Sequence, residues 1–180
     1  ILEKAIAHNL GYRFRKTKAL NSQDRYGFTD ADYDMYQTLR HNRINSQQYF
    51  AEMRMMSGAD SAIKILNDMG HKTYLVTARG CDSKGEYDAN VRQYVHQTLA
   101  KWSLLDHGLL IDEKHSFSDP TKKQIDKVVQ CKNLSITLLI DDHGKYIQKV
   151  RQADFSAIYF GVEVRNWELV ITQIKELGIN

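Results

Sequence analysis

The sequence predicts an α/β fold in which helices cover both faces of a parallel sheet, giving three layers. From residue 59 onward, short apolar runs alternate with amphipathic helical segments. Strands that alternate with helices are joined by right-handed crossovers, which make the strands parallel and put helices on both faces of the sheet. The chain has 180 residues, of which 42% are hydrophobic and 26% charged. This composition is typical of one soluble globular domain.

The elements are predicted in order along the chain. Residues 1–58 are expected to be helical and irregular, with a helix at 1–10, a second helix capped by Thr29, and a short third helix capped by Asn45 or Ser46. A helix at 59–68 should end before Gly70, since glycine favours the left-handed backbone that follows a helix. The remaining prediction is strands at 73–76, 108–111, 135–140 and 156–160, and helices at about 86–102, 120–130, 144–153 and 166–177.

Composition excludes several classes of protein. The longest apolar runs, such as 134–140, are far shorter than the roughly 20 residues of a transmembrane helix, so no membrane span is expected. The net charge is only +3, and acidic residues are spread among short basic clusters, so a small anionic substrate fits this charge as well as a polyanion does. The expected partner is a small phosphorylated substrate, without a stable nucleic-acid complex. Cys81 and Cys131 are expected to be free thiols, so the predicted location is the cytoplasm.

Three polar segments stand where a parallel sheet would bring them together. Residues 77–80 (Thr-Ala-Arg-Gly) follow one predicted strand, and Asp141 and Asp142 follow another. A lysine pair, 122–123, begins the helix that leads into the second of these strands. Sites in open parallel sheets collect at the carboxyl ends of the strands. A hydroxyl and backbone N–H groups can hold phosphate oxygens, lysine offsets charge, and adjacent carboxylates suit Mg²⁺, so the set predicts phosphoryl transfer.

In this order the motifs resemble those of the haloacid dehalogenase (HAD) superfamily of phosphatases. The segment GADSAIKILNDMGHKTYLVTARG (58–80) is similar to the helix, strand and second motif of cytosolic type C 5′(3′)-deoxyribonucleotidases and related bacterial nucleotidases. LLIDDHGKYIQKVRQADFSAIYFGVEVRNW (138–167) resembles their acidic motif, the following helix and strand, and the trailing Trp167. The resemblance implies a three-layer Rossmann-like HAD core made of residues 1–10 and 59–180, with 11–58 as a small helical cap.

The resemblance also implies an activity and roles for individual residues. The expected enzyme is a Mg²⁺-dependent phosphomonoesterase that works through an aspartyl-phosphate, acting on nucleoside monophosphates. Thr77 would be catalytic and would bind the phosphate together with Ala78 and Arg79. Asp141 would be catalytic and, with Asp142, would hold the Mg²⁺.

A lysine is implied to steady the nucleophile, and the residues offer three candidates. Lys123 is preferred to its neighbour Lys122, because a helix in which Ile125, Val128 and Val129 face the core would point Lys123 toward the site. Lys127 is the third candidate. His143, beside the acidic pair, is not needed for this chemistry.

One part of the family pattern is missing from the chain. The family's nucleophile and acid/base residue lie on an Asp-x-Asp loop after the first strand, and no such pattern precedes residue 59. Residues 30–34 (Asp-Ala-Asp-Tyr-Asp) contain the Asp-x-Asp pattern but follow no apolar run, so we expect them in the first turn of a capped helix. Since the helix at 1–10 resembles the one that follows the nucleophile loop, the loop is expected a few residues upstream of Ile1.

Other functions remain open at this point. The enzyme could act on another small phosphate ester, such as a sugar phosphate, or the chain could be a catalytically inactive HAD-like domain that binds a phosphate ligand or a partner. A receiver domain is disfavoured because its acidic residues precede the threonine and lysine. The acids and histidines at 106–115 match no common zinc spacing. A homodimer is left open.

The cap is rich in aromatic residues. Such side chains can stack on a base, but in a small helical subdomain they more often pack against one another. The aromatic residues concerned are Tyr12, Phe14, Tyr26, Phe28, Tyr36, Tyr49 and Phe50.

Overall fold

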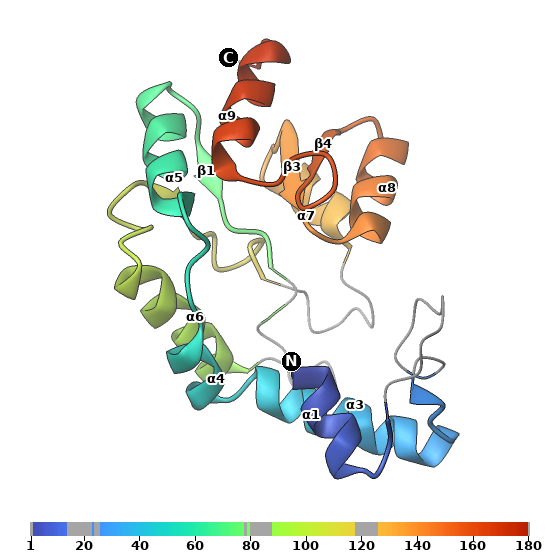
Figure 1. Ribbon diagram of the computed structural model, residues 1–180. Coiled ribbons are helices and arrows are strands. Elements are labelled where there is room, and N and C mark those ends of the chain that lie inside the picture. Colours follow the sequence, from blue (N-terminus) through green and yellow to red (C-terminus); the bar gives the residue numbers. More distant parts are fainter. Residues whose placement is uncertain are drawn as a thin grey trace.

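The computed structural model describes residues 2–13, 23, 26–77, 79, 88–117 and 126–179, and within them the chain has a mixed α/β fold (Figure 1). The helices are α1 (Leu2–Asn9), α3 (Asp30–Ile44), α4 (Gln47–Glu52), α5 (Ala59–Asp68), α6 (Ala89–Lys101), α7 (Lys127–Asn133), α8 (Gly144–Gln152) and α9 (Trp167–Glu176). The strands are β1 (Thr73–Tyr74), β2 (Leu109–Leu110), β3 (Leu138–Asp141) and β4 (Ser156–Tyr159). No helix in these residues is both long enough and apolar enough to cross a membrane.

Most helices begin and end where the sequence predicts. The hydroxyl oxygens of Thr29 and Ser46 accept hydrogen bonds from the N–H groups of Asp32 and Tyr49, each at 3.2 Å, and so cap α3 and α4. Helix α5 occupies the predicted residues 59–68, and Gly70 follows it with φ of +90°. These caps satisfy backbone N–H groups that the first helical turn leaves without a partner.

The strands form two parallel pairs. β1 pairs with β2, placing Thr73 opposite Leu109, and β3 pairs with β4, placing Asp141 opposite Tyr159. The parallel direction agrees with the prediction. Among the described residues the two pairs are separate sheets, whereas the sequence predicts one. The strands are also shorter than predicted, because the ladder between β1 and β2 covers only two residues of each strand.

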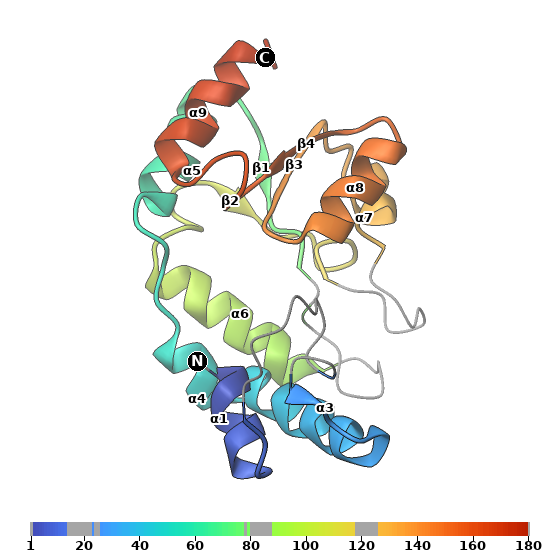
Figure 2. The same cartoon turned by 45° about the vertical axis from the view of Figure 1, so that its right-hand side comes forward.

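Helices cover both faces of the β3–β4 pair (Figure 2). On one face, α5 and α9 pack against it through Leu66, Ile158 and Val170. On the other face, α7 and α8 pack against Leu139, together with Cys131 and Val150. Side chains alternate between the two faces of a strand, so Asp141 lies on the same face as Leu139, toward α7 and α8.

Two further clusters complete the core. One joins α4, α5, α6 and β2, and it includes Phe50, Ile63, Val95 and Phe117. The other is aromatic and joins α1 to α3. Its buried members are Ile6, Ala7, Tyr26, Phe28 and Tyr36. The described aromatic residues of 11–58 therefore mainly pack against protein, as expected, while Phe14 lies outside the described residues.

Helix α7 begins later than the sequence predicts. Asp126 has an extended backbone, and its carboxylate accepts hydrogen bonds from the N–H groups of Val128 and Val129 at 3.0 and 3.3 Å. Aspartate is a strong N-terminal cap, so the helix starts at Lys127 and not at Pro120. The preference for Lys123 assumed one unbroken helix from Pro120 to Val129. The extended backbone of Asp126 interrupts that helix, so the assumption is wrong.

The buried face of α7 differs from the predicted one as well. Lys127, Gln130 and Cys131 are its buried residues, whereas Val128 and Val129 are half-buried. Positions i, i+3 and i+4 share one face of a helix. The inward face therefore carries a lysine and an amide beside the thiol.

Candidate functional site

The carboxyl ends of β1 and β3 are connected by the side chain of Lys127. Its ammonium group is ion-paired with the carboxylate of Asp141, the last residue of β3. The same ammonium donates a hydrogen bond, at 3.3 Å, to the carbonyl oxygen of Val76, two residues after β1. It also lies 5.1 Å from the centre of the Tyr146 ring on α8. This cation, which lies on α7, thus contacts two strand ends and a second helix, α8.

This ion pair is buried. The side chains of Lys127 and Asp141 are 10% and 5% exposed. The second oxygen of Asp141 accepts a hydrogen bond from the backbone N–H of His143 at 2.7 Å. Buried charges are tolerated when they are paired and hydrogen-bonded, and both conditions hold here. Burial raises the pKa of the Tyr146 phenol, and the negative charge of Asp141 raises it further.

Cys131, one turn further along α7, supplies a pH-dependent prediction. Burial raises the pKa of its thiol to about 11, against the weaker opposing effect of the Lys127 charge. Below about pH 8 the thiol is neutral in both the folded and unfolded protein, but above about pH 9 the unfolded thiol ionises first, so stability falls as pH rises.

The measurement is the free energy of unfolding in urea for Cys131 and for Cys131→Ala, at about pH 8 and about pH 10, both in a Cys81→Ser background. The stability advantage of Cys131 over alanine should shrink at the higher pH. An advantage that is the same at both pH values would contradict this prediction.

Thr77 is held at the end of β1 by two backbone hydrogen bonds. Its N–H donates to the carbonyl of Ser116 at 2.8 Å, and its hydroxyl oxygen accepts from the N–H of Arg79 at 3.2 Å. The N–H of Arg79 is among the backbone groups predicted to face a phosphate, and the structure shows it bound to the Thr77 hydroxyl. The hydroxyl that accepts this bond still carries a hydrogen that it can donate. Ala78 lies outside the described residues.

Arg79 connects this strand end to the helical region before it. Its guanidinium donates a hydrogen bond, at 2.5 Å, to the carbonyl of Ile44, the last residue of α3. It also lies 5.2 Å and 5.1 Å from the ring centres of Tyr49 and Phe50. These contacts hold the guanidinium against α3 and α4.

The lysine that the structure places in the site is the one that the sequence ranked third. Lys122 and Lys123 lie outside the described residues, so their roles remain predictions. The signal for Lys127 was present in the sequence: Asp126 is a good N-cap, and a helix starting after it puts Lys127 on the same face as the buried Cys131.

The described residues do not by themselves fit the predicted Mg²⁺ site. Both oxygens of Asp141 already accept hydrogen bonds, one of them from the Lys127 ammonium, whose positive charge would repel a second cation. Asp142 is exposed. Within the described ranges, no cluster of three or more His, Cys, Asp or Glu side chains could hold a metal ion.

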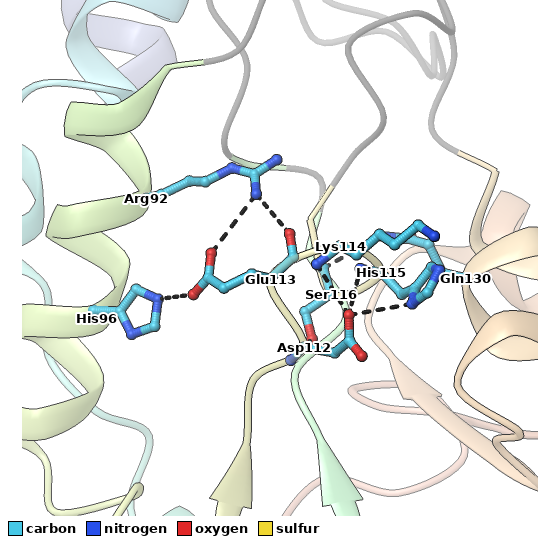
Figure 3. Close-up of polar contacts among 8 residues, drawn as sticks. All are labelled: Arg92, His96, Asp112, Glu113, Lys114, His115, Ser116 and Gln130. Carbon is cyan, nitrogen blue, oxygen red and sulfur yellow. Dashed lines mark hydrogen bonds and ion pairs between the residues drawn. The ribbon is translucent and has the colours of Figure 1, made fainter.

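Among the acids and histidines at 106–115, the side chains of Asp112, Glu113 and His115 are engaged in protein contacts, and the described ones are not grouped around a common centre. The carboxylate of Asp112 accepts hydrogen bonds from the N–H groups of Lys114 and His115, both at 2.9 Å (Figure 3). Glu113 contacts His96 at 2.5 Å and Arg92 at 3.7 Å on α6. These residues organise the loop after β2.

Comparison of the chain with protein-family models, with curated proteins and with solved structures gave no match. Its function must therefore be argued from the site itself: a buried lysine–aspartate pair, a positioned threonine hydroxyl, and the two strand ends that carry them.

Proposed function

We propose that the protein is a phosphomonoesterase of the HAD type, with Thr77, Lys127 and Asp141 in its phosphate site. The observation that carries the proposal is the position of the Lys127 ammonium, which is bound both to Asp141 and to the carbonyl of Val76, the residue before Thr77. Three groups that are far apart in sequence are thereby linked at two strand ends, in the order Thr, Lys, Asp.

The chemistry of these groups suits a phosphate monoester. Such an ester carries nearly two negative charges at neutral pH and offers only hydrogen-bond acceptors. The Thr77 hydroxyl can donate to one of its oxygens, and the Lys127 ammonium supplies positive charge. Asp141 fixes where that ammonium lies. A buried lysine held in place needs no rearrangement when charge develops on the substrate.

The finer description of the fold is part of the same proposal. Parallel strands, and helices on both faces of β3–β4, support a three-layer Rossmann-like HAD core with 11–58 as a cap. Hydrolysis in this class also requires a nucleophilic aspartate, which the resemblance places before the helix at 1–10. Nucleoside monophosphates are proposed as substrates on the resemblance alone. Because the described residues do not fit Mg²⁺ by themselves, the roles given to Thr77, Lys127 and Asp141 do not involve that ion.

A second candidate function is phosphate binding without hydrolysis. It is favoured by the position of the sequence's own Asp-x-Asp pattern, which lies in the first turn of α3 and not after a strand. There the carboxylate of Asp32 accepts hydrogen bonds from Thr29 and Tyr12, both at 2.5 Å, and these bonds lower its pKa. These contacts give Asp32 a structural role in the helix cap.

The test is a phosphatase assay on the full protein that its gene encodes, using p-nitrophenyl phosphate and nucleoside monophosphates, with and without Mg²⁺. Thr77→Val, which removes the hydroxyl but keeps the shape, should lower kcat/KM by roughly 10²-fold, the usual loss for one transition-state donor. Thr172→Val on α9 is the matched control, because this exposed threonine bonds only within its own helix in the contacts described.

The outcomes separate the two candidates. Hydrolysis that survives Thr77→Val at full rate would overturn the site assignment. Absence of hydrolysis, with inorganic phosphate bound by the wild type and not by Thr77→Val, would establish the binding function instead. Absence of both hydrolysis and binding would overturn both candidates.

A further inference from the structure

The loop that follows β2 is strongly ordered by its own hydrogen bonds. We call residues 112–117 the bracket loop. The Ser116 hydroxyl oxygen accepts a hydrogen bond from the N–H of Asp112 at 2.9 Å, and the Ser116 N–H donates to the Asp112 carbonyl at 2.8 Å. Ser116 is completely buried. These two hydrogen bonds fix the backbone at Ser116, and with it the direction of the Ser116 carbonyl.

The bracket loop is also attached to α6. Arg92 donates a hydrogen bond to the Glu113 carbonyl at 2.7 Å, and the Glu113 carboxylate contacts His96 at 2.5 Å (Figure 3). The Arg92 guanidinium lies 4.4 Å from the ring centre of Phe117, which is itself buried in the core around α6. The loop is therefore held from the side opposite the candidate site.

On the side of the site, the carbonyl of Ser116 accepts two hydrogen bonds. One comes from the Thr77 N–H at 2.8 Å and the other from the side-chain amide of Gln130 at 3.2 Å. Gln130 lies on the buried face of α7, three residues after Lys127. A single carbonyl oxygen thus contacts both the strand end that carries the threonine and the helix that carries the lysine.

The burial and hydrogen bonding of the Gln130 amide indicate that stability alone does not explain why a glutamine occupies this position. Its side chain is 7% exposed, and its carbonyl oxygen Oε1 has no hydrogen-bond partner in the described part of the chain. A buried acceptor without a donor is destabilising, and an apolar side chain of similar size would avoid that penalty. The amide group is thus present at an energetic cost, and the contact that it makes is with the Ser116 carbonyl.

We propose that Gln130 is a positioning residue, which couples Thr77 to Lys127 through the Ser116 carbonyl and the bracket loop. As a role in catalysis, this inference rests on the proposed function, whereas the coupling itself does not. Without the amide, the Ser116 carbonyl keeps only one of its two partners, and α7 loses its hydrogen bond to the bracket loop. The relative position of the hydroxyl and the ammonium is then less well defined.

The experiment compares Gln130→Met with Gln148→Met, a matched change at an exposed glutamine on α8. Gln130→Met should leave the urea unfolding midpoint unchanged or raise it. It should still speed hydrogen exchange of the Thr77 amide by about tenfold, while the Leu75 amide, bonded to the Leu110 carbonyl at 2.9 Å, exchanges at the wild-type rate. Gln148→Met should change none of these quantities.

The kinetic readout uses p-nitrophenyl phosphate. Gln130→Met should lower kcat by about tenfold with little change in KM, since misplacing a catalytic group affects the transition state most. Thr77 exchange and kcat that both stay at wild-type values would overturn the proposal, as would a large fall in the unfolding midpoint. If the wild type hydrolyses nothing, the proposed function fails. The exchange rates of Thr77 and Leu75 then decide the coupling on their own.

Discussion

Replacing Tyr36 with alanine should lower the free energy of unfolding by about 3–5 kcal/mol, the usual loss for removing a buried aromatic ring. Tyr36 is completely buried in the cluster that joins α1 to α3. Its ring lies 4.9 Å from that of Phe28 and 6.1 Å from that of Tyr33, centre to centre. Alanine would leave a cavity beside these rings that the surrounding side chains can fill only in part.

The preceding residue provides a control on the same helix. Met35 is 53% exposed, so Met35→Ala should change the free energy of unfolding by no more than about 0.5 kcal/mol. Tyr36→Phe separates the ring from its hydroxyl, and it should retain most of the stability. Chemical denaturation of the three variants gives the comparison. If Tyr36→Ala were as mild as Met35→Ala, the aromatic cluster would not be a packed core.

Local signals account for most of the correct predictions. Thr29, Ser46 and Gly70 mark helix ends through hydrogen bonds or backbone conformations that depend only on nearby residues, so they can be recognised without the fold. The parallel pairing of the strands also followed from a regular alternation of elements. The helix ends are determined within a few residues of where they occur, whereas the strand direction follows from the order of the elements along the chain.

The errors arise where distant residues compete for the same backbone groups. The N–H of Thr77 could not be assigned to Ser116 from sequence, because the two residues are far apart in the chain and meet only in the folded structure. The start of α7 was missed for a different reason: Asp126 and Pro120 are both valid start signals, and propensity alone does not choose between them. Lys127 was ranked low because the earlier start was assumed.

The place of the candidate site in the fold was therefore predictable, but its residues were predictable only in part. Asp141 at the end of β3 and Thr77 after β1 follow from strand prediction, since strand ends are where parallel sheets expose groups. Which lysine contacts both strand ends depends on where the short helix α7 begins. That Gln130 contacts Ser116 is a tertiary fact with no signal in the local pattern.

Removing one partner of the buried ion pair should have an effect as large as the loss of Tyr36. Lys127→Met leaves the Asp141 carboxylate buried without its cation, which typically costs about 3–5 kcal/mol. The exposed pair Lys64–Asp68, with side chains 59% and 63% exposed, is the matched control. Lys64→Met should cost no more than about 0.5 kcal/mol, because water and salt screen such pairs.

The double variant Lys127→Met/Asp141→Leu tests what the pair is for. Replacing both charges with apolar side chains of similar size is often neutral or stabilising, so the double variant should recover most of the stability that Lys127→Met loses. Phosphatase activity should be absent from the single and the double variant alike. Restored stability without activity would mean that the pair is kept for its charge at the two strand ends. A double variant as unstable as Lys127→Met would instead assign the pair to folding, and the site would then lose its main support.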